Sequence, residues 1–282
     1  MKLIKNKFNE VYSGIKILMF LSFYFAMLII INNAFISRIE FPNQILSIFI
    51  GKTTSVIILI IGFLFVYYIE HRSIKHFGII LSKKTFKDFY IGLFLGMISI
   101  IVISSILFIT NNAKITYGIT NPTFSIDIVY LFFAFIMVGI DEELLVRGYM
   151  VHTLSRYNNK YVVYIVPAVI FSALHGLNPN VSTMGLINIV LVGILFTYMT
   201  LKTKNILMAI GFHITWNFFQ GGFFGFNVSG NHLPSIYPVS IINDNILTGG
   251  DFGLEGGILT TICIIIMSFI VYRLPSGTSK TL

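Results

Sequence analysis

Residues 128–156, IVYLFFAFIMVGIDEELLVRGYMVHTLSR, are the stretch of sequence that decides the fold. They are typical of one long apolar helix whose middle carries four charged residues: Asp141, Glu142, Glu143 and Arg147. Charged side chains deep in a membrane cost several kcal/mol unless they are paired, so they are rare and functional by default. No proline or cluster of turn residues follows the acids. We therefore predict that the helix continues through them. The alternative is a helix that ends at Ile140, with the acids in an interfacial loop.

The composition around this stretch predicts a membrane protein. Of the 282 residues, 56% are hydrophobic and 11% are charged, and the mean hydropathy is +0.86. Several apolar runs reach about 18 residues or more, which is enough to cross about 30 Å of hydrocarbon. The net charge of +8 comes from lysines and arginines in short loops between these runs, a pattern of membrane topology rather than of nucleic-acid binding. We expect an all-α fold, a polytopic transmembrane helical bundle in the lipid bilayer.

Eight spans are expected, and their charge distribution sets the topology. The spans are residues 15–36, 45–69, 89–110, 127–156, 161–176, 183–201, 205–219 and 257–274. An even number places both termini on one side, together with most of the basic residues. Only Arg38, Lys52 and Lys114 fall on the other side. The positive-inside rule then makes both termini cytoplasmic, in a multi-pass protein of a cell membrane. The basic composition, rich in asparagine and isoleucine, suggests a bacterial plasma membrane.

The chain is expected to form a single integral membrane domain over residues 1–282. Its parts would be the N-terminal spans within 15–110, a core at 127–219, an outer loop at 220–256 and the last span at 257–274. The outer loop is rich in glycine, asparagine, serine and proline. In this topology it is external and partly covers the bundle.

Three pairs of residues stand one helical turn apart in three of these spans. Glu143 and Arg147 can form an ion pair that neutralises both charges. The other two pairs place histidines in apolar helices: Phe171 with His175, and His213 with Asn217. Taken singly, each histidine is more often a packing or interfacial residue. His213 and Asn217 could also be an interhelical hydrogen-bond pair.

The depths of these side chains allow them to meet. At about 1.5 Å per residue, Glu142 lies about 21 Å back from residue 156, and His175 about 21 Å in from residue 161. By the same measure, His213 and Asn217 lie about 12 and about 18 Å in from residue 205. One carboxylate, two imidazoles and an amide could then share a cavity, which favours a site over separate packing roles.

Such a cluster predicts a hydrolase that needs no nucleophilic serine or cysteine. A glutamate and a histidine beside a water can activate that water as general base. A second histidine with an asparagine can stabilise a developing oxyanion. Histidine and glutamate are also zinc ligands, but the sequence has no HExxH spacing. A metal is possible but not indicated, and no cofactor is expected.

The three motifs resemble a known family. EELLVR (142–147), FSALH (171–175) and HITWN (213–217) are similar, in order and spacing, to the EExxxR, FxxxH and HxxxN motifs of the CPBP family. These are intramembrane glutamic endopeptidases, which include CAAX proteases and bacteriocin-processing members and are also called the ABI family. The resemblance covers about residues 127–217, and it implies a metal-independent protease. It also implies a role for each motif residue: Glu142 as general base with help from His175, His213 and Asn217 as oxyanion stabilisers, Glu143 and Arg147 as a structural ion pair, and Phe171 as a packing residue at the cavity wall.

The implied function is hydrolysis of a peptide bond in a membrane-associated or leader-type peptide, in peptide processing or bacteriocin self-immunity. Two other functions are open. The first is a catalytically silent membrane scaffold or regulator of the same fold, against which the intact motifs argue. The second is a transporter, since buried acids and histidines also build proton relays. The sequence shows no repeated halves of the kind that transporters often carry. No feature indicates an oligomeric state.

Overall fold

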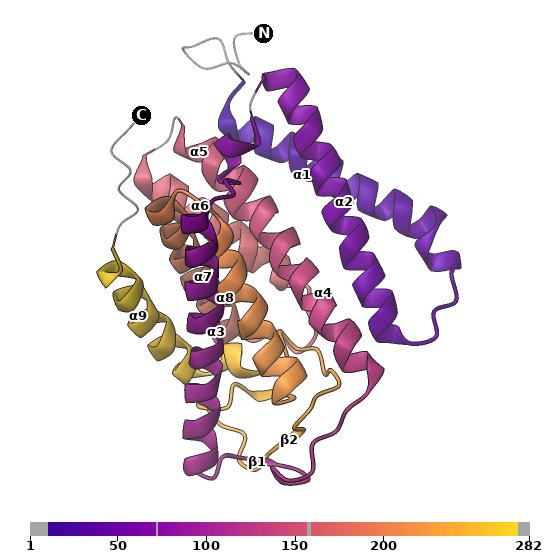
Figure 1. Cartoon of the computed structure of the whole chain (residues 1–282), viewed down its shortest axis with the longest axis vertical. Helices are drawn as coiled ribbons and strands as arrows, with labels where there is room; N and C mark the ends of the chain where they lie inside the picture. The colour runs from indigo at the N-terminus through magenta and orange to yellow at the C-terminus, as the bar shows by residue number, and fades with distance from the viewer. Residues whose placement is uncertain (1–10, 72, 157–158, 276–282) are drawn as a thin grey trace.

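The computed structural model describes residues 11–71, 73–156 and 159–275, and these form a bundle of α-helices (Figure 1). The expected all-α helical bundle is therefore confirmed. The principal helices are α1 (Ser13–Ala34), α2 (Gln44–Glu70), α3 (Lys83–Ile109), α4 (Ile126–Glu143), α6 (Lys160–His175), α7 (Thr183–Thr203), α8 (Leu207–Asn217) and α9 (Ile258–Arg273). Each helix corresponds to one expected span, and most helix ends lie within a few residues of the expected ones. Helices α4 and α8 are shorter than their spans because further helical segments continue them.

Four helical stretches in the described part of the chain are long and apolar enough to cross a membrane: Ser13–Arg38, Gln44–Glu70, Lys83–Ile109 and Thr183–Thr203. Helices α6 and α9 are apolar but have 16 residues each, and at 1.5 Å per residue each is about 24 Å long. The chain is a membrane protein, while the count of eight spans stays a prediction. The cytoplasmic location of the termini also stays a prediction, and residues 1–10 and 276–282 lie outside the described residues.

The helix that carries the acids does not end at Ile140. Helix α4 runs to Glu143 and passes without a break into a π-helical segment, Leu144–Val151, and then into α5 (His152–Ser155). The continuity was predicted, and the alternative of an interfacial loop is wrong. The π-helical segment was not predicted. Such segments are rare and occur frequently at functional sites, and every residue of this one is buried.

Helix α8 is fixed against α3 by a close approach of the two backbones. A Cβ atom added to Gly92 would lie 2.1 Å from the carbonyl oxygen of Met208, and one added to Gly96 would lie 2.3 Å from that of Phe212. Small residues four positions apart allow membrane helices to pack this closely. Because α8 carries His213 and Asn217, this crossing sets the position of two expected site residues.

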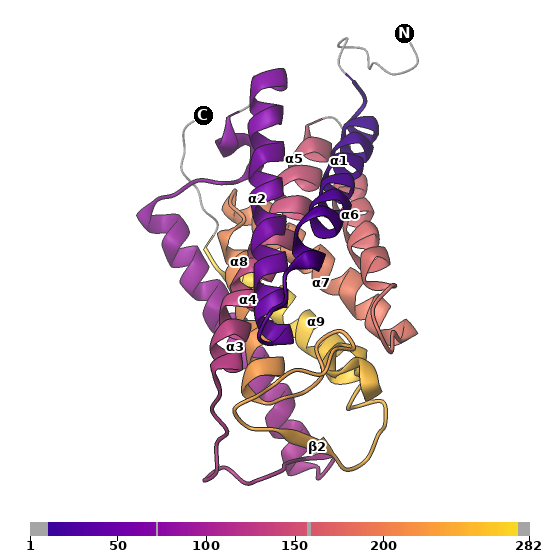
Figure 2. The same cartoon turned by 90° about the vertical axis from the view of Figure 1, so that its right-hand side faces the viewer.

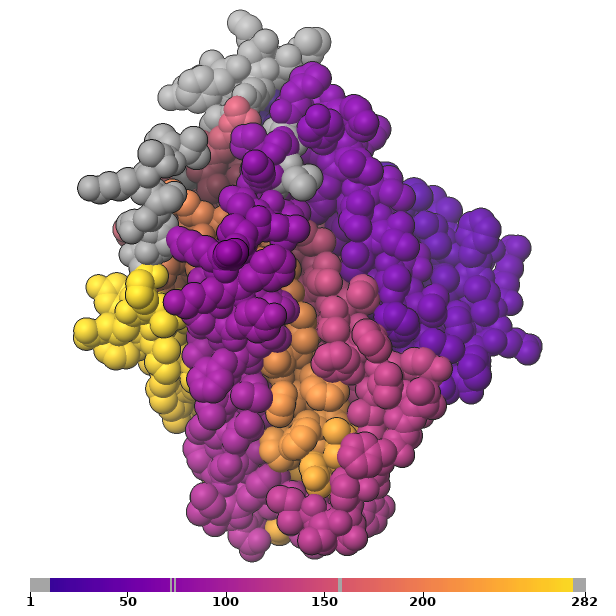
Figure 3. All heavy atoms as spheres, viewed as in Figure 1, coloured from indigo at the N-terminus to yellow at the C-terminus, as the bar shows by residue number. Residues whose placement is uncertain are grey.

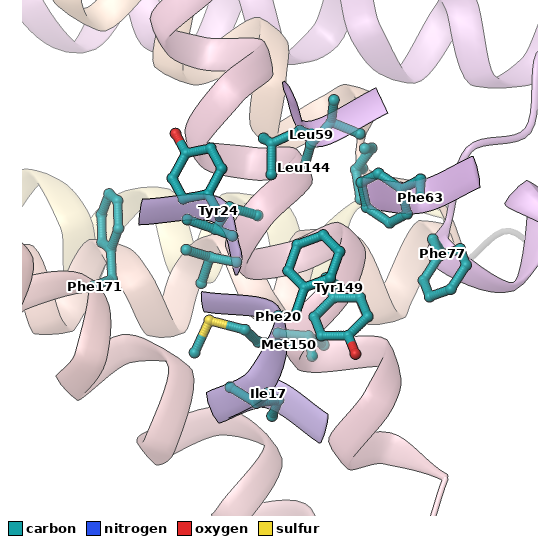
Figure 4. Packing of buried hydrophobic residues seen from close by; sticks show 14 of the residues in the cluster. Ile17, Phe20, Tyr24, Leu59, Phe63, Phe77, Leu144, Tyr149, Met150 and Phe171 are labelled. Carbon is teal, nitrogen blue, oxygen red and sulfur yellow. The ribbon is translucent and has the colours of Figure 1, made fainter. Parts of the chain in front are cut away.

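Helices α1 and α2 form a flank of the molecule beside α4 (Figures 1 and 3). Their packing on the π-helical segment is aromatic (Figure 4). The rings of Phe20 and Tyr149 stack with their centroids 3.9 Å apart, and Phe63 meets the same tyrosine edge-on. The flank is thus anchored where the helix that bears the acids changes its winding.

The connection between α8 and α9 lies at one end of the bundle (Figure 2). It begins with a second π-helical segment, Phe218–Phe223, and includes strand β2 (Val239–Ile241). Strand β2 pairs antiparallel with β1 (Ala113–Ile115), which follows α3. This connection is the expected outer loop, and it contributes one wall of the cavity described next.

Candidate active site

A cavity of about 570 Å³ lies between α1, α2, α4 with its π-helical continuation, α6, α7, α8, α9 and the connection from α8 to α9. The four residues predicted to be catalytic all line it: Glu142, His175, His213 and Asn217. Phe171, predicted to pack at the cavity wall, lines it too. The structure thus brings together side chains from three helices that are distant in the sequence.

Glu142 faces both histidines with the same carboxylate oxygen. Its Oε2 atom lies 3.8 Å from Nε2 of His175 and 3.8 Å from Nε2 of His213. These distances are too long for direct hydrogen bonds. They suit an arrangement in which one small molecule, such as a water, is shared by the carboxylate and the two rings.

A backbone contact sets the orientation of the His175 ring. Its Nδ1 atom lies 2.8 Å from the carbonyl oxygen of Phe171, one turn earlier in α6. A carbonyl oxygen only accepts, so Nδ1 donates the proton of this bond. In the neutral ring, Nε2 then presents a lone pair toward Glu142. The Phe171 ring meets the imidazole edge-on, with centroids 4.7 Å apart.

His213 is oriented by Glu143, which also forms a buried ion pair with Arg147. Its Nδ1 atom lies 3.0 Å from Oε1 of Glu143, and Nη1 of Arg147 donates to the same oxygen at 3.1 Å. Nη2 of Arg147 donates to the carbonyl oxygen of Gly193 in α7 at 3.1 Å, and the guanidinium lies 4.6 Å from the centroid of the Phe171 ring. Both partners of the pair are fully buried. The ion pair was expected from the spacing, whereas the hydrogen bond that Glu143 accepts from His213 was not.

Asn217 lies one turn beyond His213 at the end of α8 and is 6% exposed. The second π-helical segment begins at the next residue. Two of the three helices that carry the predicted catalytic residues, α4 and α8, therefore change to π-helical winding directly beside the site. Nothing in the sequence pattern distinguishes these segments from ordinary α-helix.

Lys52 of α2 is a site residue that sequence reasoning missed. We grouped it with the basic residues of the outer side, but its ammonium lies 3.5 Å from Oε1 of Glu142 and 3.6 Å from Oδ2 of Asp141. The grouping treated it only as a marker of topology, although Lys52 stands inside an apolar helix. The rule that singled out the acids, that ionisable residues in an apolar span are functional by default, would have found it.

Asp141 belongs to a second polar cluster, which joins three helices. Its Oδ1 atom accepts hydrogen bonds from the Tyr24 hydroxyl of α1 at 2.8 Å and from Ser55 Oγ of α2 at 2.7 Å. The two hydroxyl oxygens are also in contact with each other. All three side chains are buried. A single tyrosine and a single serine in apolar helices carry no sequence signal of such a role.

The outer loop contributes a carboxyl group to the same cavity. Glu255 accepts a hydrogen bond from Nε2 of Gln220 at 2.6 Å and one from the backbone of Ser229 at 3.3 Å. Burial raises the pKa of Glu255, and the hydrogen bonds from Gln220 and Ser229 act in the opposite direction. These contacts join the beginning of the connection to its end.

Within the described residues, no group of three or more histidine, cysteine, aspartate or glutamate side chains is arranged to hold a metal ion. That the reaction needs no metal stays a prediction.

Comparison with known proteins identifies the segment that contains the three motifs. Residues 123–219 match the family described as Rce1-like, type II CAAX prenyl endopeptidase. Comparisons with curated proteins and with solved structures found no match. The matched segment includes Glu142, His175, His213 and Asn217 and leaves out α1, α2 and α3. The match agrees with the family predicted from the motifs: over residues 123–219 this membrane protein is similar to the Rce1-like CAAX endopeptidases, a family of intramembrane proteases that act on peptide or protein substrates.

Proposed function

We propose that this protein hydrolyses a peptide bond of a membrane-associated or leader-type peptide, with Glu142 as the general base. The observation that carries the proposal is the convergence of Glu142 on the two histidines. One carboxylate oxygen lies 3.8 Å from Nε2 of both rings, in a cavity that also contains Asn217.

In this mechanism, a water between Glu142 and His175 is the nucleophile. The Glu142 carboxylate takes a proton from the water while the water oxygen bonds to the carbonyl carbon of the substrate. The Nε2 lone pair of His175 accepts from the same water and orients it, since Nδ1 of this ring is occupied by the carbonyl oxygen of Phe171. The proton on Glu142 then passes to the leaving amine nitrogen as the C–N bond breaks.

His213 and Asn217 stabilise the oxyanion of the tetrahedral intermediate. To donate from Nε2, His213 must carry protons on both ring nitrogens. The carboxylate of Glu143 accepts a hydrogen bond from Nδ1, and it orients the ring in the way that the aspartate of a serine protease triad orients its histidine. The Asn217 side-chain amide supplies a second donor without a change of charge.

The proposed substrate is a short extended segment of a leader peptide, a signalling-peptide precursor or a membrane protein. A cavity of about 570 Å³ is in the range of sites for small ligands, so it takes a few side chains and not a folded domain. We place the protein in a bacterial plasma membrane, with both termini cytoplasmic. Bacteria usually lack prenylated CAAX proteins, so peptide processing or bacteriocin self-immunity is the biological setting that we propose.

The decisive experiment compares peptide termini in host membranes that contain wild type, Glu142→Gln or Asp127→Asn at equal protein levels. Asp127 lies in the first turn of α4 and is a matched acid outside the cavity lining. We expect peptide ends that are present with wild type and Asp127→Asn and missing with Glu142→Gln. Identical termini in all three membranes would contradict proteolysis and support the silent scaffold.

A further inference from the structure

Lys52 brings a positive charge to the catalytic carboxylate from outside the segment that matches the family. It belongs to α2, whereas the matched segment begins at residue 123. Its side chain lines the cavity and is 35% exposed. It is therefore neither a buried structural lysine nor a loop residue of the membrane surface.

The charges near Glu142 divide into one pair and one group of three. Of the three consecutive acids, Glu143 is paired with Arg147 at 3.1 Å. The other two, Asp141 and Glu142, lie 3.6 and 3.5 Å from the same ammonium of Lys52. Neighbouring carboxylates oppose each other's ionisation, and an ammonium close to both offsets that repulsion.

Asp141 is suited to be the fixed end of this bridge. It is 2% exposed, and the hydroxyls of Tyr24 and Ser55 both donate to its carboxylate. Those two residues come from α1 and α2, so the flank that supplies Lys52 also fixes the group that anchors it. Glu142, by contrast, has a side chain that is 21% exposed and faces the cavity.

We propose that Lys52 is a positioning residue of the active site: anchored by Asp141, its ammonium keeps Glu142 ionised and aimed at the two imidazoles. The titratable and charged groups that face this bridge are Tyr24 on α1, Asp141 and Glu143 on α4, Arg147 on the π-helical segment, His175 on α6 and His213 on α8. The inference rests on the proposed function only in taking Glu142 as the base. It concerns the state of a carboxylate, which can be measured without a substrate.

The test uses dicyclohexylcarbodiimide, an apolar reagent that modifies protonated carboxyl groups. Purified full-length protein is labelled over a series of pH values, and the modified fraction of Glu142 is measured by peptide mass spectrometry. In Lys52→Met we expect the labelling midpoint to move to higher pH by about one to three units, the effect of removing an opposite charge within 4–6 Å. Lys52→Arg should restore the wild-type midpoint. The matched control Lys114→Met, in β1 and away from the cavity lining, should leave it unchanged.

The variant Asp141→Asn tells whether a shift in Lys52→Met comes from the lost charge or from a general loosening of the cavity. Asparagine keeps a side-chain oxygen that can accept a hydrogen bond from Lys52 and removes the neighbouring negative charge. The ammonium therefore stays beside Glu142, and the midpoint should stay or move to lower pH. Loosening would move both variants in the same direction. An unchanged midpoint in Lys52→Met, or a raised midpoint in Asp141→Asn, overturns the proposal, and the second result decides alone if Lys52→Met does not fold. If the shifts occur while no peptide end depends on Glu142, the positioning role stands and the proposed protease function fails.

Discussion

The segment 123–219 and the flank of α1 and α2 contribute to one cavity in different ways. The segment supplies the carboxylate, the two imidazoles and the amide, all in motifs with a helical spacing. The flank supplies Tyr24, Lys52 and Ser55, which contact Asp141 or Glu142 and belong to no motif. Motifs therefore identify the groups proposed to react. The residues that hold those groups in place depend on tertiary packing and can come from any part of the chain.

The largest effect should follow from the change that removes the proposed base. Glu142→Gln keeps the shape of the side chain and takes away its capacity to accept a proton. General-base catalysis is worth about 10²- to 10⁴-fold in rate, so cleavage of a peptide found in the membrane comparison should fall by about that factor. The rate of cleavage by purified protein measures this, with Asp127→Asn as control. A variant with more than half of the wild-type rate would remove Glu142 from the mechanism.

The largest loss of stability should follow when the buried ion pair of Glu143 and Arg147 is broken. Arg147→Met leaves the Glu143 carboxylate fully buried without its cation, and loss of one partner of a buried pair costs about 3–5 kcal/mol. Thermal unfolding of the purified protein in detergent measures the change. The double variant Glu143→Gln/Arg147→Met should recover much of the stability and remain inactive, because His213 has lost its anionic partner. Equal losses in the single and double variants would contradict the pairing.

A smaller effect is expected at the crossing of α3 and α8, which lies outside the flank and still positions the motifs. Gly96→Leu places a Cβ atom 2.3 Å from the carbonyl oxygen of Phe212, and overpacking of this kind costs about 1–3 kcal/mol. The helices must separate, so His213 should move away from Glu142 and the cleavage rate should fall as well. Gly51→Leu is the matched control, because nothing lies within 4 Å of a Cβ atom at Gly51. Equal stability of the two leucine variants would show that the crossing is not tight.

The sequence predicts the contributions of the segment 123–219 better than those of the flank of α1 and α2. The helices and the meeting of Glu142 with His175 and His213 were predictable because hydrophobic runs and i, i+4 spacings are local properties of the chain. The bond between Glu143 and His213 and the bridge of Lys52 depend on how helices pack, which no local spacing encodes. The π-helical segment Leu144–Val151 was unpredictable for another reason, since its residues are equally compatible with α-helix.

The smallest effect should come from the flank, where a single change leaves the rest of the polar cluster in place. Tyr24→Phe removes one hydrogen bond to Asp141, worth about 1 kcal/mol, while Ser55 and Lys52 keep their contacts with this carboxylate. Unfolding in detergent should show a loss of that size, and the cleavage rate should fall by less than about tenfold. The control is Tyr68→Phe, an exposed tyrosine of α2.

The double variant Tyr24→Phe/Ser55→Ala gives the sharper test of the comparison. Among the described residues, two hydroxyls and one ammonium contact Asp141. The double variant removes both hydroxyls and leaves the ammonium of Lys52. Because residues in one hydrogen-bonded network are coupled, its loss of stability should exceed the sum of the single losses. A strictly additive result would mean that the two hydroxyls act independently, and the flank would then pack beside the active site without organising it.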